Sequence, residues 1–198
     1  MNWKGRDGDL YTDRNSPDVD KRAKWFDKVL PKDITGVSEL GTNKAQNLQA
    51  IAKVRDVLVW GREINNKAAK IARAKGIFVT EDSSLNGSLN LCSGVLIHIN
   101  PIDIVKIFEE LQSPNTQYIL MIENKTDSIE TINDRWYKNA MWSMSYGEEF
   151  VKRYPEWKII KKGYVNGKKP KDMDFTAPLT ETKTGFHPDD FMWLLKRK

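Results

Sequence analysis

The sequence predicts a doubly wound α/β fold: a mostly parallel sheet of seven strands, with helices on both faces and an antiparallel hairpin at one edge. From residue 36 to residue 124, short apolar runs typical of buried strands alternate with helical patterns, and the loops are short. Because crossovers between parallel strands are right-handed, this alternation predicts helices on both faces of the sheet. The chain then ends in two apolar runs separated by a long polar stretch, which indicates the hairpin.

The first helical pattern covers residues 16–30. Ser16 is a favourable N-cap, Pro17 suits the first helical position, and Pro31 ends the pattern. Apolar residues recur along it with the spacing of an amphipathic helix. The preceding segment, GDLYTDRN at residues 8–15, has no core pattern of its own.

Strands and helices then alternate along the chain. The second strand is apolar almost throughout, which is typical of a strand buried on both faces. Asn65 or Asn66 caps the helix after it, Gly76 ends that helix, and Pro101 begins the next one. The expected strands in this part are residues 36–41, 56–64, 77–82, 88–94 and 117–124, and the expected helices are residues 43–55, 65–76 and 101–112.

The remaining sequence differs in character. Residues 125–145 contain aromatic residues and methionine without clean periodicity, and a helix over 146–155 ends at Pro155. Apolar runs at 157–165 and 189–198 predict two strands, and the polar stretch between them predicts a long loop. These two strands are expected to form the antiparallel edge hairpin.

Composition limits the class of protein. A chain of 198 residues suits one domain, and 39% hydrophobic with 30% charged residues indicates a globular protein. No apolar stretch approaches the roughly 18 residues that cross a bilayer, and the start lacks the apolar core of a signal peptide. With Cys92 as the single cysteine, we expect neither a disulfide within the chain nor a cysteine-based metal site, and a cytoplasmic location is expected.

The formal net charge of +5 does not by itself indicate a nucleic-acid-binding protein. Lysine and arginine are spread along the chain and mixed with acidic residues, and the densest basic run covers residues 158–171. A dedicated nucleic-acid groove is therefore not favoured.

Candidate ligand-binding residues follow the first strand. In open α/β sheets, ligands bind beyond the carboxyl ends of the strands. Glu39, Gly41 and Asn43 stand at that end, within SELGTNKAQNL at residues 38–48. Gly41 allows a ligand to approach the backbone closely, and bare backbone N–H groups are expected to point at that ligand. A purely structural turn could use the same residues.

Glu63 follows the second strand, about twenty residues after this loop, where a carboxylate accepts hydrogen bonds from a ribose diol. The alternative is that the Glu63 carboxylate caps the next helix. Glu63 would also repel a 2′-phosphate, which disfavours an NADP-type cofactor. The loop from Gly41 to Ala45 lacks the second and third glycines of a pyrophosphate cradle. A cofactor with a sugar and a base but no pyrophosphate fits better, and S-adenosyl-L-methionine is such a cofactor.

Four stretches carry a resemblance to a known family: GDLYTDRN (8–15), SELGTNKAQNL (38–48), GREIN (61–65) and GVLIHINP (94–101). With them, the chain resembles the class I S-adenosylmethionine-dependent methyltransferases, and more narrowly the methylases associated with pseudaminic acid biosynthesis. The similarity extends over nearly the whole chain. It implies a Rossmann-like methyltransferase fold in a single domain over residues 1–198, with an N-terminal lid and helix (1–30), a cofactor-binding half (36–124) and an acceptor-side half (125–198).

The resemblance also implies roles for individual residues. Arg14 would pair with the cofactor carboxylate, and His98 would be the catalytic residue of the methyl-transfer pocket. The implied cofactor-binding residues are Tyr11, Arg14 and Asn15 in the lid, Glu39, Gly41 and Asn43 in the loop, Glu63 at the ribose, Ser84 and Leu85 along the adenine, and Gly94 and Val95 beside the methyl group. Ala45 and Ser88 depart from the family pattern, which prefers glycine and aspartate there.

The methyl acceptor is less defined. His98 could act as a general base for an oxygen acceptor or only orient it. The expected acceptor is a small molecule, with a sugar or a nucleotide sugar as the first candidate; Arg135, Trp136 and Tyr137 could contact it or pack over the sheet edge. Asn100 and Pro101 do not continue into the motif of adenine methylases. The alternatives are an inactive cofactor-binding protein with a partner role and a nucleic-acid or protein methylase. No metal is expected.

Overall fold

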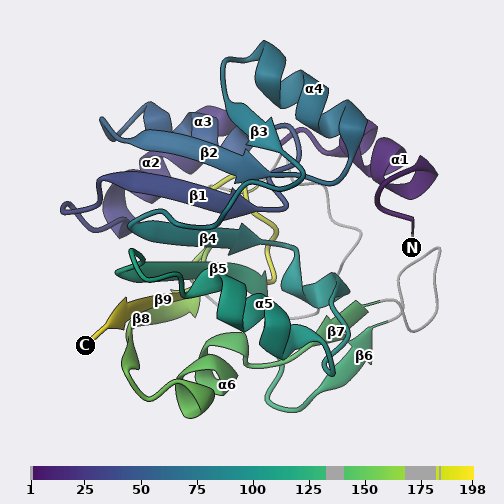
Figure 1. Cartoon of the computed structure of the whole chain (residues 1–198). Helices are drawn as coiled ribbons and strands as arrows, with labels where there is room; N and C mark the ends of the chain where they lie inside the picture. The colour runs from purple at the N-terminus through teal and green to yellow at the C-terminus, as the bar shows by residue number, and fades with distance from the viewer. Residues whose placement is uncertain (1, 133–140, 168–181, 183) are drawn as a thin grey trace.

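The computed structural model describes residues 2–132, 141–167, 182 and 184–198. Its main sheet has seven strands in the order β3-β2-β1-β4-β5-β9-β8 (Figure 1). The first five strands pair in parallel, whereas β9 is antiparallel to β5 and β8 is antiparallel to β9. The predicted doubly wound sheet with an antiparallel edge hairpin is confirmed. The strands are β1 (Gly36–Leu40), β2 (Leu58–Arg62), β3 (Phe78–Thr80), β4 (Leu89–Ser93), β5 (Tyr118–Asn124), β8 (Trp157–Tyr164) and β9 (Asp190–Arg197).

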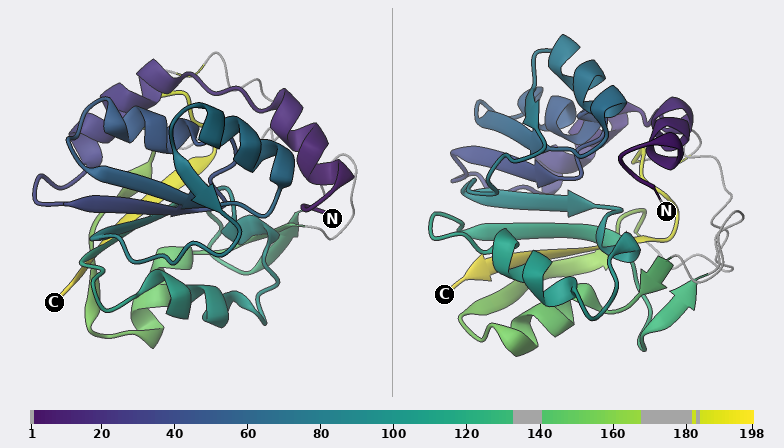
Figure 2. Two further views of the ribbon diagram at one scale, coloured as in Figure 1. Left: turned by 45° about the horizontal axis from the view of Figure 1, so that its top comes forward. Right: turned by 45° about the vertical axis from the view of Figure 1, so that its right-hand side comes forward.

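Helices cover both faces of this sheet (Figures 1 and 2). One face packs against α2 (Val19–Val29), α3 (Gln46–Ala52) and α4 (Asn66–Ala74), and the other packs against α5 (Ile104–Leu111) and α6 (Tyr146–Arg153). Alternate residues of the strands enter the two cores, as the period of a strand requires. Phe26 and Leu48 belong to the first core, while Phe108 and Phe150 belong to the second.

Several predicted helix boundaries can be compared with the structure. The N-cap of α4 is Asn65, whose side chain accepts from Ala68 N, and Gly76 (φ +80°) follows the end of this helix, as predicted. The prediction that Ser16 caps the helix over residues 16–30, now α2, is wrong. Asp18 is the N-cap of α2, because its carboxylate accepts from the two free N–H groups of Asp20 and Lys21.

The helix predicted to begin at Pro101 starts three residues later, at Ile104. The preceding residues form a turn, because Asn100 accepts through its side chain from Ile102 N and through its carbonyl from Asp103 N. A short 3₁₀ helix, η1 (Leu96–His98), lies between β4 and this turn.

The N-terminal segment is a helix, α1 (Arg6–Arg14), which the sequence pattern did not predict. It lies beyond the carboxyl ends of the strands (Figure 2). Polar contacts hold it against α4: the side chain of Asn65 donates to Trp3 O (3.1 Å) and to Asp9 Oδ1 (2.9 Å), and Lys67 pairs with Asp13. Since these contacts leave no apolar stripe in the sequence, hydrophobic periodicity could not reveal this helix.

A second, two-stranded antiparallel sheet was also not predicted. It pairs β6 (Glu130–Ile132) with β7 (Met141–Ser143), within the region whose sequence lacks clean periodicity. Within the described residues, no helix combines the length and the apolar character that crossing a membrane requires.

Candidate active site

The loop after β1 is held by the end of β2. Gly41 N and Thr42 N both donate to Arg62 O, at 2.9 and 3.1 Å, and Asn43 N donates to Glu63 Oε2 at 2.7 Å. The expectation of bare N–H groups is therefore wrong for these three residues, because β2 supplies their acceptors. Gly41 (φ +66°) is needed for packing as well, since a Cβ there would lie 2.5 Å from Val95 Cγ2.

Glu63 joins this loop to the start of α4. Its carboxylate accepts from Asn43 N through Oε2 and from Asn65 N through Oε1 at 2.8 Å. Burial raises the pKa of Glu63, and these two N–H groups oppose that rise. The carboxylate keeps lone pairs for further donors, and the residue is only partly buried. The capping interaction is thus observed, and the chemistry of the group also fits a ribose diol.

The departure at Ala45 has a conformational explanation. Ala45 has φ +59° and Asn43 has φ +48°, both in the left-handed region. Glycine adopts this conformation without a steric penalty, whereas alanine is strained by about 1–2 kcal/mol. The glycine that the family pattern prefers here is thus what the backbone conformation favours.

We therefore expect Ala45→Gly to stabilise the protein by up to about 1 kcal/mol, the relief of strain being partly offset by the greater chain entropy of glycine. Urea unfolding of both variants measures this difference. Ala45→Val should instead be strongly destabilising, because position 45 is fully buried and a β-branched residue resists positive φ. A loss of stability in Ala45→Gly would contradict the left-handed conformation.

A buried network extends from this loop into the acceptor-side half. Glu39 accepts from Thr42 Oγ1 (2.6 Å) and from Asn47 Nδ2 (2.7 Å), and burial raises its pKa to about 7. Arg22 donates to Asn47 Oδ1 (2.7 Å) and to Gly185 O (3.0 Å). Sequence reasoning missed Arg22. The available signal was its position on the apolar stripe of α2, where a cation requires buried partners.

The N-terminal segment brings an aromatic side chain to His98. The ring of Trp3 lies 4.5 Å from the imidazole of His98 and 5.6 Å from the ring of Tyr11, centroid to centroid. Asn15 is buried, and its carbonyl accepts from Gln46 Nε2. The structure therefore brings Tyr11 and His98 together through Trp3, a residue that the sequence did not single out.

Arg14 is placed differently. Its side chain is solvent-exposed, with Cζ 5.5 Å from the centre of the Tyr11 ring. The buried guanidinium in this region belongs to Arg22, which interacts electrostatically with Tyr11 and Glu39. Arg22 is therefore a second candidate partner for an anionic ligand group beside the lid.

Glu123 fixes the turn that carries His98. This fully buried carboxylate at the end of β5 accepts from Val95 N and Leu96 N at 3.0 Å and from Ile97 N at 3.4 Å. Burial raises its pKa to about 8, although the backbone N–H groups oppose the rise. Sequence reasoning missed Glu123, although a lone acidic residue near the end of an apolar strand was a signal.

The raised pKa values of Glu39 and Glu123 predict how stability depends on pH. Unfolded glutamate titrates near pH 4.3, so between that pH and about 7 to 8 the folded state holds more protons than the unfolded state. The stability that these groups contribute is fully present below the unfolded pKa and is lost as pH rises through the folded one. Thermal unfolding should therefore show Tm falling between about pH 5 and pH 8.

Glu123→Gln tests the origin of this slope, because glutamine does not titrate. The variant should lose much of the decrease at the upper end of the pH range, whatever its absolute stability. An unchanged slope would show that Glu123 is ionised throughout.

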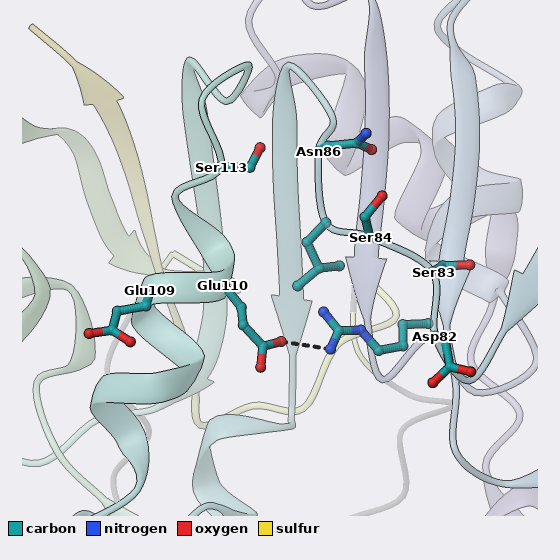
Figure 3. A pocket seen from close by; sticks show the side chains of 9 residues that line it. Asp82, Ser83, Ser84, Asn86, Glu109, Glu110 and Ser113 are labelled. Carbon is teal, nitrogen blue, oxygen red and sulfur yellow. Dashed lines mark hydrogen bonds and ion pairs between the residues drawn. The ribbon is translucent and has the colours of Figure 1, made fainter.

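Ser84 and Leu85 lie apart from Glu63. The carbonyl of Ser84 accepts from Trp60 Nε1 on β2, and the carbonyl of Leu85 accepts from Asn90 Nδ2 on β4. Both donors lie before the carboxyl ends of their strands, whereas Glu63 lies after one. Both line a cavity of about 340 Å³ on the α5 side of the sheet, whose lining does not include Glu63 (Figure 3). Their role along the adenine stays a prediction.

Three further expectations concern the surroundings of the site. Gly94 (φ +65°) faces open space, with no atom within 4 Å of an added Cβ, so the turn after β4 leaves room for a ligand. Ser88, where the family has aspartate, accepts from Thr35 N and Gly36 N and so stabilises the start of β1. Arg135, Trp136 and Tyr137 lie outside the described residues.

No protein-family model matches the sequence, and no curated protein is significantly similar to it. Solved structures match it in fold. Magnesium protoporphyrin IX methyltransferase from Synechocystis PCC 6803, solved with bound S-adenosylmethionine, superposes with a TM-score of 0.67 over 100% of this chain and 94% of that one, at 13% identity. This chain has the class I methyltransferase fold. A didemethyltoxoflavin N1-methyltransferase from Burkholderia thailandensis, solved with S-adenosylhomocysteine, gives a TM-score of 0.62 at 14% identity over 97% and 83% of the chains.

Not every similar structure has the same length. Mitomycin 7-O-methyltransferase gives a TM-score of 0.58 at 12% identity, and the match covers 96% of this chain but 55% of that enzyme. The chain thus spans about half the length of that methyltransferase. At such low identities the comparisons establish the fold, and the narrower resemblance to the pseudaminic-acid-associated methylases stays a prediction.

Proposed function

We propose that this protein is an S-adenosylmethionine-dependent methyltransferase that acts on a small molecule in the cytoplasm. One observation carries the proposal: in a class I methyltransferase fold, Glu63, the loop from Gly41 to Asn43 and His98 follow the carboxyl ends of β2, β1 and β4. The helix α1 lies beyond this carboxyl edge of the sheet (Figure 2). This edge is where open α/β sheets bind ligands.

The residues at this edge fit the proposed cofactor. Glu63 would accept the ribose hydroxyls, Tyr11 with Arg14 or Arg22 would face the methionine end, and Gly94 would leave room beside the methyl group. The bound cofactor supplies an activated methyl group on a sulfonium. Glu123 fixes the backbone that carries His98, and Trp3 packs on the ring of His98, so both would orient the imidazole toward an acceptor. His98 would take the proton from an acceptor hydroxyl as the new bond forms.

We further propose O-methylation of a sugar or nucleotide sugar. The resemblance to the pseudaminic-acid-associated methylases supports this acceptor, and the aromatic ring of Trp3 beside His98 suits stacking against a sugar ring. The structural neighbours include an O-methyltransferase and an N-methyltransferase of small molecules, which is compatible with this class of acceptor.

A second candidate function is cofactor binding without catalysis. The strained Ala45 and the occupied N–H groups of the loop favour it. Incubation with methyl-labelled S-adenosylmethionine and a pool of sugars and nucleotide sugars distinguishes the two. The proposal predicts S-adenosylhomocysteine and label in a small molecule. Cofactor binding without either product, across the whole pool, would support the inactive protein.

A separate prediction concerns the helix α1 as a lid over the site. Because α1 is held mainly by polar contacts with α4, it should open locally more often than the sheet does. Hydrogen exchange at residues 3–14 should become slower when S-adenosylhomocysteine binds, while exchange in β4 and β5 should stay unchanged. Equal exchange at residues 3–14 with and without the ligand would contradict a role for α1 as a lid.

A further inference from the structure

On one face of the sheet, the part formed by β2 and β3 is not covered by any helix of the described residues. The connection from β3 to β4, residues 81–88, contains no helix, and α5 and α6 lie over the half of the sheet formed by β4, β5, β8 and β9 (Figure 1). In doubly wound folds helices normally cover both faces. Leu58 on β2 is 76% exposed and Phe78 on β3 is 65% exposed.

The strand register places these side chains together. Phe78 is opposite Trp60, two residues from Leu58, so Leu58, Trp60 and Phe78 share one face, which we call the β2–β3 face. The intervening valines, Val59 and Val79, pack into the core on the opposite face. Trp60 is fixed on the sheet, because its indole N–H donates to Ser84 O at 3.0 Å.

The rim of the β2–β3 face is acidic. Asp82, Glu109 and Glu110 line the adjacent cavity of about 340 Å³ (Figure 3). Glu110 pairs with Arg62 at 2.6 Å, whereas Asp82 and Glu109 form no salt bridge in the part of the chain that the structure describes. The chain has a net charge of +5, so the negative charge of this rim is opposite in sign to that of the whole chain.

We propose that the β2–β3 face binds an amphipathic helix of a partner protein, with its apolar side on Leu58, Trp60 and Phe78 and its lysines or arginines toward Asp82 and Glu109. A helix about 10 Å wide covers two strands spaced about 4.8 Å apart, so one helix suffices. Charge complementarity selects a basic helix and disfavours an anionic lipid surface.

A second copy of this chain offers a poorer occupant. Among the described helices, the exposed large apolar side chains are limited to Leu10 on α1. A single leucine cannot cover the three side chains of the β2–β3 face. The described helices of a second copy thus do not supply the occupant, and two copies that met through their own β2–β3 faces would bring the two acidic rims together. A basic helix of a different protein is the occupant that we propose.

Two synthetic helical peptides test this inference on the full chain. Both carry the same leucine stripe, but one has lysine and the other glutamate on its flanks. In an NMR titration, the lysine peptide should shift the amide signals of β2 and β3. The glutamate peptide should bind more weakly by about tenfold or more. Leu58→Asp and Phe78→Asp should each weaken the lysine peptide about tenfold, whereas Leu10→Asp, an equally polar change on an exposed leucine, should have no effect.

A charge reversal makes the test sharper. The double variant Asp82→Lys, Glu109→Lys should prefer the glutamate peptide. Equal binding of both peptides, shifts that map elsewhere, or a wild-type dimer that Leu58→Asp converts to a monomer would overturn the proposal. Affinity for S-adenosylhomocysteine should be the same in the wild type, Leu58→Asp and Phe78→Asp, because these two exposed side chains are not among the proposed cofactor-binding residues. A loss of peptide binding in these two variants is therefore independent of the proposed enzymatic function.

Discussion

Replacing Glu63 with alanine should weaken the binding of S-adenosylmethionine by about 1.5–3 kcal/mol, or roughly 10- to 150-fold in Kd, the usual worth of hydrogen bonds to a charged group. The carboxylate would accept the ribose hydroxyls directly. It also holds Asn43 N in the loop and Asn65 N at the start of α4, so its loss also loosens the loop. We therefore also expect folding stability to fall by about 1 kcal/mol or more.

Two comparisons separate ribose recognition from loop stability. Glu63→Gln retains the side-chain shape and an acceptor oxygen, so it should keep the fold and lose an intermediate part of the affinity. Asp56→Ala removes an exposed carboxylate just before β2, at the opposite end of that strand, and should leave affinity unchanged. Calorimetry with S-adenosylmethionine measures all three variants. An unchanged Kd for Glu63→Ala would contradict the ribose assignment.

Replacing His98 with asparagine should reduce methyl transfer by about 10²–10⁴-fold while leaving cofactor affinity nearly unchanged, because a general base acts on the acceptor rather than on the cofactor. Asparagine can still hydrogen-bond but cannot take a proton at neutral pH. The readout is the rate at which the two products, S-adenosylhomocysteine and the methylated acceptor, are formed.

His187 provides the matched control, because it is the only other histidine in the sequence and follows the long polar loop. His187→Asn should retain the rate of the wild type. If His98→Asn keeps nearly full rate, then His98 only orients the acceptor, and proximity carries the reaction. A pH–rate profile without a limb near the usual histidine pKa of about 6.5 would support the same conclusion.

The sheet could be predicted because each strand is an apolar run of its own, bounded by turn residues. The sequence also indicated Asn65 or Asn66 as a cap and Gly76 as a helix end, since both act locally. The lid helix was missed because its contacts with α4 are polar and join residues far apart in the sequence.

The site was predicted less completely, for a similar physical reason. Glu63 and His98 stand at strand ends, where the fold class alone makes a residue a candidate. Arg22 and Glu123 act through backbone and side-chain groups that only the folded chain brings near them, such as Gly185 O and Leu96 N. Ala45 was noticed as a departure, but its meaning depends on a backbone angle that the sequence does not contain.

Calorimetric titration of the intact protein with S-adenosylhomocysteine tests the central claim most directly, since this product is stable and needs no acceptor. We predict saturable binding of one molecule per chain, weakened by Glu63→Ala and retained by His98→Asn. The absence of binding to wild-type protein that circular dichroism shows to be folded would contradict the account, because the class I methyltransferase fold would then carry no cofactor site.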